Sequence, residues 1–208
     1  MRFRYSKEGK AKYISHLDLM STMQRSFRRA GINLKYSEGF NPHPYMSVAL
    51  PLSVGCESSC ELIDVALAEN IKPDVKTIKL PEGITLIDVY TPVRKFSDIT
   101  WIEINGNLHY SNPVPQSMVD SIENCLKKES IIISKRTKRG HKDLDIAPYI
   151  KDMKFNKNNY ISFSAKISAQ NPTINGDDLV NALDDEVKPD HISIRRVEIY
   201  DESMIVFK

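Results

Sequence analysis

His43 stands in the segment GFNPHP, residues 39–44, whose residue types are typical of a binding loop. Pro42 and Pro44 fix the backbone dihedrals on both sides of the histidine, and Gly39 permits a turn that residues with a β-carbon resist. The imidazole is therefore expected on a stiff loop, next to basic residues. This combination predicts a site for a phosphate-rich ligand, and RNA is the leading candidate.

Aromatic and polar side chains around His43 supply the other contacts that such a site needs. Phe40 could stack on an unpaired base, as aromatic residues of RNA-binding proteins do, or it could fill the core. Asn41 and His43 could hydrogen-bond a base or a ribose, and Lys35 could bind a phosphate. We expect Phe40 to be more exposed than Tyr36, which ends a predicted strand.

A helix is predicted to precede this loop, from residue 15 or 16 to residue 30, with a cluster of arginines near its end. Its apolar residues recur at intervals of three and four and form one buried stripe, made of Met20, Met23, Phe27 and Ala30. Arg25, Arg28 and Arg29 fall at spacings that gather them on one surface, with no glutamate on the helix to pair with them. The face could be an ordinary solvated one, since cations near a helix C-terminus also complement the helix dipole. Its one-sidedness favours a phosphate-binding face.

A second basic cluster lies in the segment SKRTKRGHKDLD, residues 134–145, and is predicted to be a flexible loop. Five cations fall within eight residues, namely Lys135, Arg136, Lys138, Arg139 and Lys142. Such a run could simply be solvated. Alternatively it is a phosphate clamp, because cations that neutralise a nucleic-acid backbone release its counterions.

His16 and His43 are the two histidines that could take part in catalysis. General acid–base cleavage of RNA needs such a pair, titrating near neutral pH, together with a cation that stabilises the transition state. Asp18 could orient His16, or it could cap the first helical turn. A histidine outside such a pair is more often a hydrogen-bonded structural residue.

Composition narrows the classes of protein to which the chain could belong. The 208 residues carry a net charge of only +2, so any anion site must be local, and three cysteines without disulfide spacing indicate a cytoplasmic protein. The charged start predicts no signal peptide, and no apolar run approaches the roughly 20 residues that span a bilayer. We expect no metal site and no cofactor, because the chain has no zinc spacing, no GxGxxG and no GxSxG.

The predicted elements indicate an α+β protein of two ferredoxin-like (split βαβ) units with antiparallel sheets, at residues 1–92 and 99–208. In the first unit we predict strands at 2–6, 32–36, 46–54, 60–67 and 84–90, and helices at 15–30 and 73–79. In the second we predict strands at 99–105, 131–134, 160–167 and 192–200, helices at 116–127 and 177–183, and a helical turn at 146–150. The similar order suggests a degenerate duplication.

The run from Tyr13 to Asp64 closely resembles the N-terminal signature of the bacterial radical-SAM-linked protein family, a family of unknown function. SHLDL, FRRAG and YSEGFNPHP occur in order, and the later KRTKRGHKDLDIAPYI resembles the family's second basic block, so nearly the whole chain is covered. Members look like partners, sometimes fused, of radical SAM proteins and tend to be encoded near ribosomal-protein and ribonuclease genes. The resemblance therefore implies an RNA or translation context.

This chain lacks the CxxxCxxC that a radical SAM enzyme needs for its cluster, so it cannot perform that chemistry alone. More distantly, its split βαβ order and N-terminal histidine are similar, at the level of fold, to the RAMP-type CRISPR repeat-processing ribonucleases.

Together these observations predict an RNA-binding accessory protein, for transfer or ribosomal RNA, that acts with a radical SAM partner in RNA modification or ribosome-related processing. One alternative is a metal-independent ribonuclease or RNA-modifying enzyme that uses His16 and His43. Another is a protein–protein adaptor without RNA binding. The first reading expects His43 and both cationic clusters to open onto one groove. The oligomeric state is left open.

Overall fold

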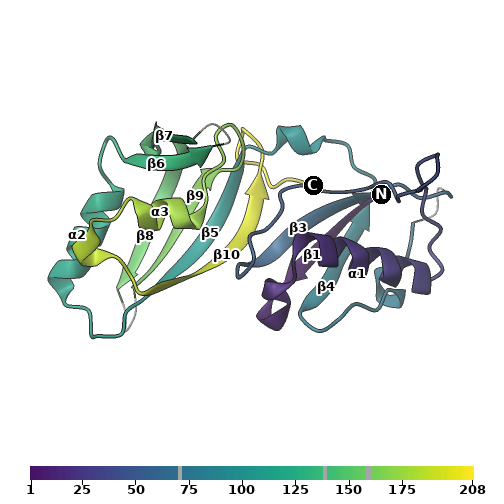
Figure 1. Cartoon of the computed structure of the whole chain (residues 1–208), viewed down its shortest axis with the longest axis horizontal. Helices are drawn as coiled ribbons and strands as arrows, with labels where there is room; N and C mark the ends of the chain where they lie inside the picture. The colour runs from purple at the N-terminus through teal and green to yellow at the C-terminus, as the bar shows by residue number, and fades with distance from the viewer. Residues whose placement is uncertain (70–71, 138–139, 158–160) are drawn as a thin grey trace. The chain divides into compact units, whose positions relative to one another are not determined.

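The computed structural model describes residues 1–69, 72–137, 140–157 and 161–208 and divides into two compact units. Unit 1 comprises Met1–Asp98 and Lys208, and unit 2 comprises Ile99–Phe207. Each unit combines an antiparallel sheet with few helices, so the predicted mixed α+β class is confirmed (Figure 1).

Unit 1 is built on the sheet β4-β1-β3-β2, in which every neighbouring pair is antiparallel. Its strands are β1 (Arg2–Lys7), β2 (Met46–Val48), β3 (Glu57–Val65) and β4 (Ile84–Tyr90). Because β3 lies between β1 and β2, the strands that precede and follow the helix α1 are split by a third. Short 3₁₀ turns complete the unit, namely η1 (Gly9–Tyr13), η2 (Val75–Thr77) and η3 (Phe96–Asp98).

Helix α1 (His16–Arg29) covers one face of this sheet and confirms the predicted helix (Figure 1). Ser15 caps its start by accepting a hydrogen bond from the backbone N–H of Asp18. Gly31 ends it at φ +75°, and the N–H of Ile32 returns to the carbonyl of Phe27, as in a Schellman motif. Its apolar stripe packs on the sheet in one core cluster, which includes Phe3, Leu19, Met23, Phe27, Ile63 and Val89.

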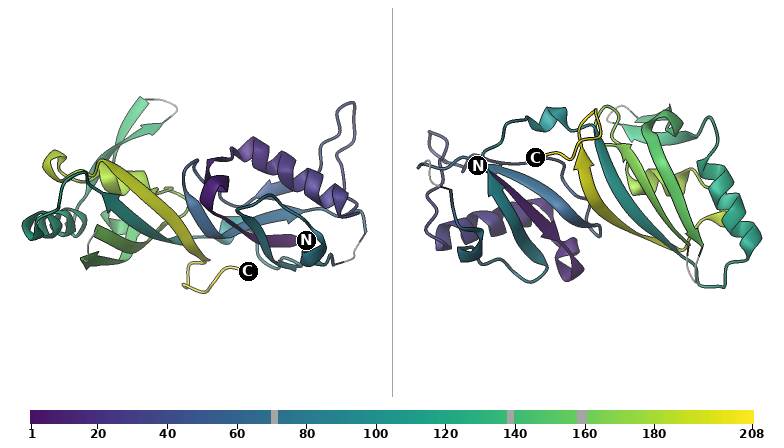
Figure 2. Two further views of the ribbon diagram at one scale, coloured as in Figure 1. Left: turned by 90° about the horizontal axis from the view of Figure 1, so that it is seen from below. Right: turned by 180° about the vertical axis from the view of Figure 1, so that it is seen from behind.

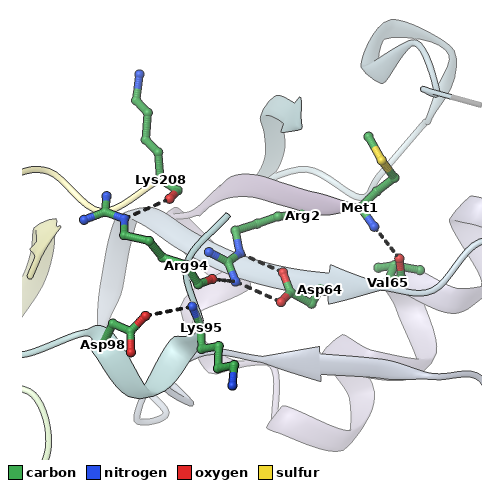
Figure 3. A network of polar contacts seen from close by, with 8 residues as sticks. All are labelled: Met1, Arg2, Asp64, Val65, Arg94, Lys95, Asp98 and Lys208. Carbon is green, nitrogen blue, oxygen red and sulfur yellow. Dashed lines mark hydrogen bonds and ion pairs between the residues drawn. The ribbon is translucent and has the colours of Figure 1, made fainter. Parts of the chain in front are cut away.

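A buried polar network occupies the opposite side of β1 (Figure 3). Since Phe3 joins the core under α1, Arg2 points to the other face of the sheet. Its Nε and Nη2 donate to the two carboxylate oxygens of Asp64 at 2.7 and 2.9 Å, and Nη2 also donates to the carbonyl of Arg94 at 3.0 Å. Its guanidinium carbon lies 4.2 Å from the ring centroid of Phe96. The network thereby ties β1, β3 and the segment after β4.

Unit 2 repeats the same strand order, β10-β5-β9-β8, again with antiparallel neighbours. Its main strands are β5 (Trp101–His109), β8 (Ile150–Lys157), β9 (Ile161–Ser168) and β10 (His191–Tyr200). The strands β6 (Ile132–Thr137) and β7 (Gly140–Asp145) form a separate two-stranded sheet. The helices are α2 (Gln116–Leu126) and α3 (Gly176–Asn181), with 3₁₀ turns η4 (Ala147–Tyr149) and η5 (Asp185–Val187).

Helix α3 lies across one face of this sheet, and the view from behind shows the strands uncovered on the other (Figures 1 and 2). The capping box of Asn175 and Asp178 starts α3. Gly176 packs so closely on Ile194 of β10 that a β-carbon there would lie 2.6 Å from the isoleucine side chain. The α3 side of the sheet is therefore the packed face of unit 2.

Several predicted elements differ from the structure. The strand predicted at 32–36 is reduced to isolated bridges at Leu34 and Tyr36. The strand predicted at 46–54 ends at Val48, because the following residues lead to Pro51, which has no N–H to donate to a neighbouring strand. The helix predicted at 73–79 is the single turn η2. The flexible loop predicted at 134–145 is instead the hairpin of β6 and β7. Strand β8 was not predicted, because its lysines, aspartate and asparagine have low strand propensity.

In the described ranges, no helix is long and apolar enough to cross a membrane.

Candidate functional site

The segment from Tyr36 to Pro44 is a closed loop that projects from unit 1. Tyr36 and Pro44 form an isolated bridge at its base. Ser37 closes the loop above them, because its N–H donates to the carbonyl of His43 at 2.8 Å and its hydroxyl accepts from the N–H of His43 at 2.9 Å. Gly39, at φ +113°, makes the turn at the tip. The loop is therefore defined by its own backbone bonds.

The tip of the loop presents its side chains to solvent. Phe40 is fully exposed, at 111% of its reference area, and Asn41 and His43 are exposed as well. Tyr36, by contrast, is half-buried and accepts a hydrogen bond from the amide of Gln24 on α1. This difference between Phe40 and Tyr36 confirms the prediction from the sequence.

The arginines of α1 lie at the same end of unit 1 as this loop. Figure 2 shows the loop rising beside the C-terminal end of α1. Arg25, Arg28 and Arg29 are exposed, as is Lys35 at the start of the loop. Arg29 also donates to the hydroxyl of Ser26 at 3.0 Å, which holds its guanidinium against the helix. We call this set, with Phe40, Asn41 and His43, the loop–helix surface.

A depression of about 490 Å³ adjoins this surface, and sequence reasoning identified only Arg29 of its lining. Arg29 and Lys79 line it with their cationic side chains, together with Ser26, whose hydroxyl accepts from Arg29, and Thr77, whose hydroxyl donates to the carbonyl of Asp74. Lys79 stands nearly fifty residues after α1 in the chain. Only the packing of the segment around η2 against α1 brings it beside Arg29, so local sequence spacing carries no signal for the pair. This arrangement has the chemistry of a phosphate subsite.

His16 lies at the other end of unit 1 from His43. The residue before the cap of α1, Ile14, accepts a hydrogen bond at 2.8 Å from Lys7, which pairs with Ser58 at the start of β3. The His43 loop is held instead beyond the end of β3, where the N–H of Ala66 donates to the carbonyl of Tyr45. Eight residues of strand separate these points, which is about 26 Å.

The structure therefore does not bring the two histidines together as an acid–base pair. The Asp18 side chain pairs with the cap of α1, since it accepts a hydrogen bond from the hydroxyl of Ser15 at 2.7 Å. Nothing in this arrangement supports a concerted proton transfer between His16 and His43.

The second cationic cluster belongs to the β6–β7 hairpin of unit 2. The ammonium of Lys135 is held by Asp178 at 2.6 Å and by the carbonyl of Thr173, so protein partners occupy it. Lys142, directly opposite in the hairpin, is exposed. Arg136 is placed in β6 by its backbone, and Lys138 and Arg139 lie outside the described residues. The groove expected between this cluster and His43 stays a prediction.

Titratable groups that could hold a metal are dispersed in the part of the chain that the structure describes. No cluster of three or more histidine, cysteine, aspartate or glutamate side chains there could hold a metal ion. The loop–helix surface itself offers groups for hydrogen bonding, stacking and charge.

Comparisons with known proteins place this geometry in context. The chain is similar in fold to a chain in the crystal structure of a Cbf5-Nop10-Gar1 complex, with a TM-score of 0.53 and 12% sequence identity. The likeness covers 96% of this chain and 50% of that one, so the protein spans about half the length of that chain. No curated protein matches.

A family model matches residues 1–189, which include the loop–helix surface and the β6–β7 hairpin. That model describes uncharacterized proteins conserved in bacteria, under the designation DUF2344. Because the match extends over most of the sequence, the chain belongs to this bacterial family.

Proposed function

We propose that the protein is an RNA-binding accessory protein, which takes structured transfer or ribosomal RNA on the loop–helix surface. The observation that carries the proposal is Phe40, a fully exposed aromatic side chain at the tip of a loop closed by its own hydrogen bonds. An aromatic side chain in water gains nothing for folding, whereas it gains about 1–3 kcal/mol by stacking on an unpaired base.

Charge on the same surface supports RNA over an uncharged ligand. Arg25, Arg28 and Arg29 are exposed on one side of α1, and Lys79 lines the same depression as Arg29. Arginine matches phosphate geometry with two parallel donors, and each contact releases counterions from the nucleic acid. Phosphates would bind these cations while Asn41 and His43 read a base or ribose beside Phe40.

Fluorescence anisotropy with labelled transfer RNA at several salt concentrations tests the proposal. Three phosphate contacts contribute about 2 to 3 to the slope of log affinity against log salt, so changing Arg25, Arg28 and Arg29 to glutamine should reduce the slope by that amount. Phe40→Ala should weaken binding about tenfold at every salt concentration and leave the slope unchanged, because stacking involves no counterions.

The matched control is the triple change of Lys10, Lys127 and Lys128 to glutamine, which removes the same charge from exposed positions elsewhere. A loss of slope equal to that of the arginine variant would show that only net charge matters. Affinity that does not respond to salt, or to Phe40→Ala, would contradict the proposed surface.

We further propose that the protein acts with a radical SAM partner and that both units are ferredoxin-like. The resemblance in sequence supports the partner, and the shared strand order of the two units supports the fold. Copurification of a radical SAM protein after nuclease treatment tests the partnership. Recovery that requires intact RNA would mean that RNA, rather than a protein contact, links the two.

A further inference from the structure

One face of the unit 2 sheet carries a continuous polar surface that the loop–helix surface does not include. Directly opposed residues of neighbouring strands share a face, so the register groups this surface into rows. The rows across β10, β5, β9 and β8 are Arg195, Asn105, Ser164 and Lys154, then Ser193, Asn107, Ser162 and Asn156, and at the end of the face His191 beside His109. The opposite face holds Ile194 and Phe163, under α3. No helix of the described residues covers the polar face (Figure 2, right).

Short polar side chains fill the middle of this face, and they are without partners among the residues that the structure describes. Five of them are Asn105, Asn107, Asn156, Ser162 and Ser164. Within the described ranges, none of these five side chains makes a hydrogen bond or ion pair. A solvated sheet face is usually lined by longer charged or β-branched residues, which cover the strands. On this face the amide and hydroxyl groups are therefore available for hydrogen bonds to a ligand.

The central strand β5 departs from strand propensity at this point. The run Asn105-Gly106-Asn107 is typical of a tight turn, yet it lies in the middle of a nine-residue strand between two others. Packing accounts for Gly106, because a β-carbon there would lie 2.3 Å from the ring of Phe163. It does not account for the two asparagines, whose side chains point the other way. Departures of this kind are expected at functional sites.

Cations and imidazoles border the amides. Lys154 and Arg195 flank Asn105 in the same row, about 14 Å apart across four strands. At the end of the face, the rings of His109 and His191 lie 4.5 Å apart, and the hydroxyl of Ser193 is 2.9 Å from Nε2 of His109. Both rings are exposed. Cations at the margins, hydrogen-bonding groups in the centre and a flat ring at one end complement a single-stranded nucleic acid.

We propose that this face binds a single-stranded segment of two or three RNA nucleotides. The proposal rests on the function proposed above and adds a second surface, with a different ligand conformation. Asn105 and Asn107 hydrogen-bond base edges, since an asparagine amide presents a donor and an acceptor side by side. Lys154 binds phosphate, and the exposed imidazole of His191 stacks on a base. We expect single strands to bind better than a duplex, in which the Watson–Crick edges are paired and the stacked bases leave no free face for His191.

The experiment uses the full chain and labelled eight-nucleotide RNAs, single-stranded or as a duplex. The test variant combines Asn105→Ala, Asn107→Ala and Lys154→Gln. The control variant combines Asn124→Ala with Lys10→Gln and Lys128→Gln, and these three control positions are exposed. We expect the test variant to lose at least tenfold in affinity for the single strand. The control should lose less than threefold, and Asn105→Ser with Asn107→Ser should recover part of the binding.

A comparison of Phe40→Ala with the Asn105 and Asn107 changes, in transfer RNA binding and in single-strand binding, separates this inference from the function proposed above. If Phe40→Ala weakens transfer RNA binding while the Asn105 and Asn107 changes leave single-strand affinity intact, the sheet face is refuted and the loop–helix surface stands. If the asparagine changes weaken single-strand binding while Phe40→Ala has no effect, the sheet face stands instead. Equal affinity for duplex and single strand, or no single-strand binding at all, would overturn the inference.

Discussion

Removal of the carboxylate from Asp64 should destabilise unit 1 more than removal of its partner, Arg2. The Arg2 side chain is only 1% exposed, whereas that of Asp64 is 33% exposed. Asp64→Ala therefore leaves a guanidinium buried without its carboxylate, while Arg2→Met leaves a carboxylate that water can reach (Figure 3). Breaking a buried pair costs about 3–5 kcal/mol, and the partial exposure of Asp64 places the expected loss near 3 kcal/mol.

The two single variants and their combination form a double-mutant cycle. Arg2→Met should cost about 1 kcal/mol, because water can reach the one-third exposed carboxylate of Asp64 once its partner is gone. The double variant Arg2→Met with Asp64→Ala should cost only about 1–2 kcal/mol, since it leaves no charge buried without its partner. A coupling free energy of about 2–3 kcal/mol is therefore expected between the two positions.

Urea unfolding followed by circular dichroism gives these free energies. With a slope of about 1–3 kcal/mol per molar urea, a loss near 3 kcal/mol should lower the Asp64→Ala midpoint by about 1–3 M. Hydrogen exchange of peptides from β1 and β3 should show the loss of protection within unit 1. The reasoning is refuted if Arg2→Met is as destabilising as Asp64→Ala, or if the two effects simply add.

Two further predictions concern unit 2. Burial raises the pKa of Tyr110 to about 12, with the charge of Asp190 acting in the same direction, and its hydroxyl donates to the carbonyl of Val187 at 2.7 Å. Because the fold favours the neutral phenol, this contribution to stability is complete below pH 10 and disappears as the pH rises towards 12. Absorbance titration should show a late phenol that Tyr110→Phe removes, and a titration that Tyr110→Phe leaves unchanged would contradict the prediction. Gly106→Ala should lower the free energy of unfolding by about 1–3 kcal/mol, because its β-carbon would meet the Phe163 ring. In urea unfolding, the double variant with Phe163→Leu should recover part of that loss. An unchanged midpoint for Gly106→Ala would refute this packing argument.

Local sequence determined much of unit 1. The extent of α1 follows from Ser15, the apolar stripe and Gly31, each of which acts through bonds within a few residues. The exposure of Phe40 follows from its place between a glycine and a polar residue, before two prolines, in a segment that cannot bury its side chains. These features need no distant partner, so residue type and spacing predict them.

Tertiary structure decided which of these groups meet. It placed His16 and His43 at opposite ends of unit 1, because the strand between them is extended, and it joined Arg29 to Lys79 from a distant segment. It turned the expected basic loop into a hairpin, in which Lys135 reaches Asp178 on α3. It also placed the turn-like run around Gly106 in a central strand, because pairing with β9 and β10 and the ring of Phe163 outweigh local propensity. Pairing across a sheet depends on residues far apart in the chain, so neither the composition nor the spacing of one segment could reveal the polar face of unit 2.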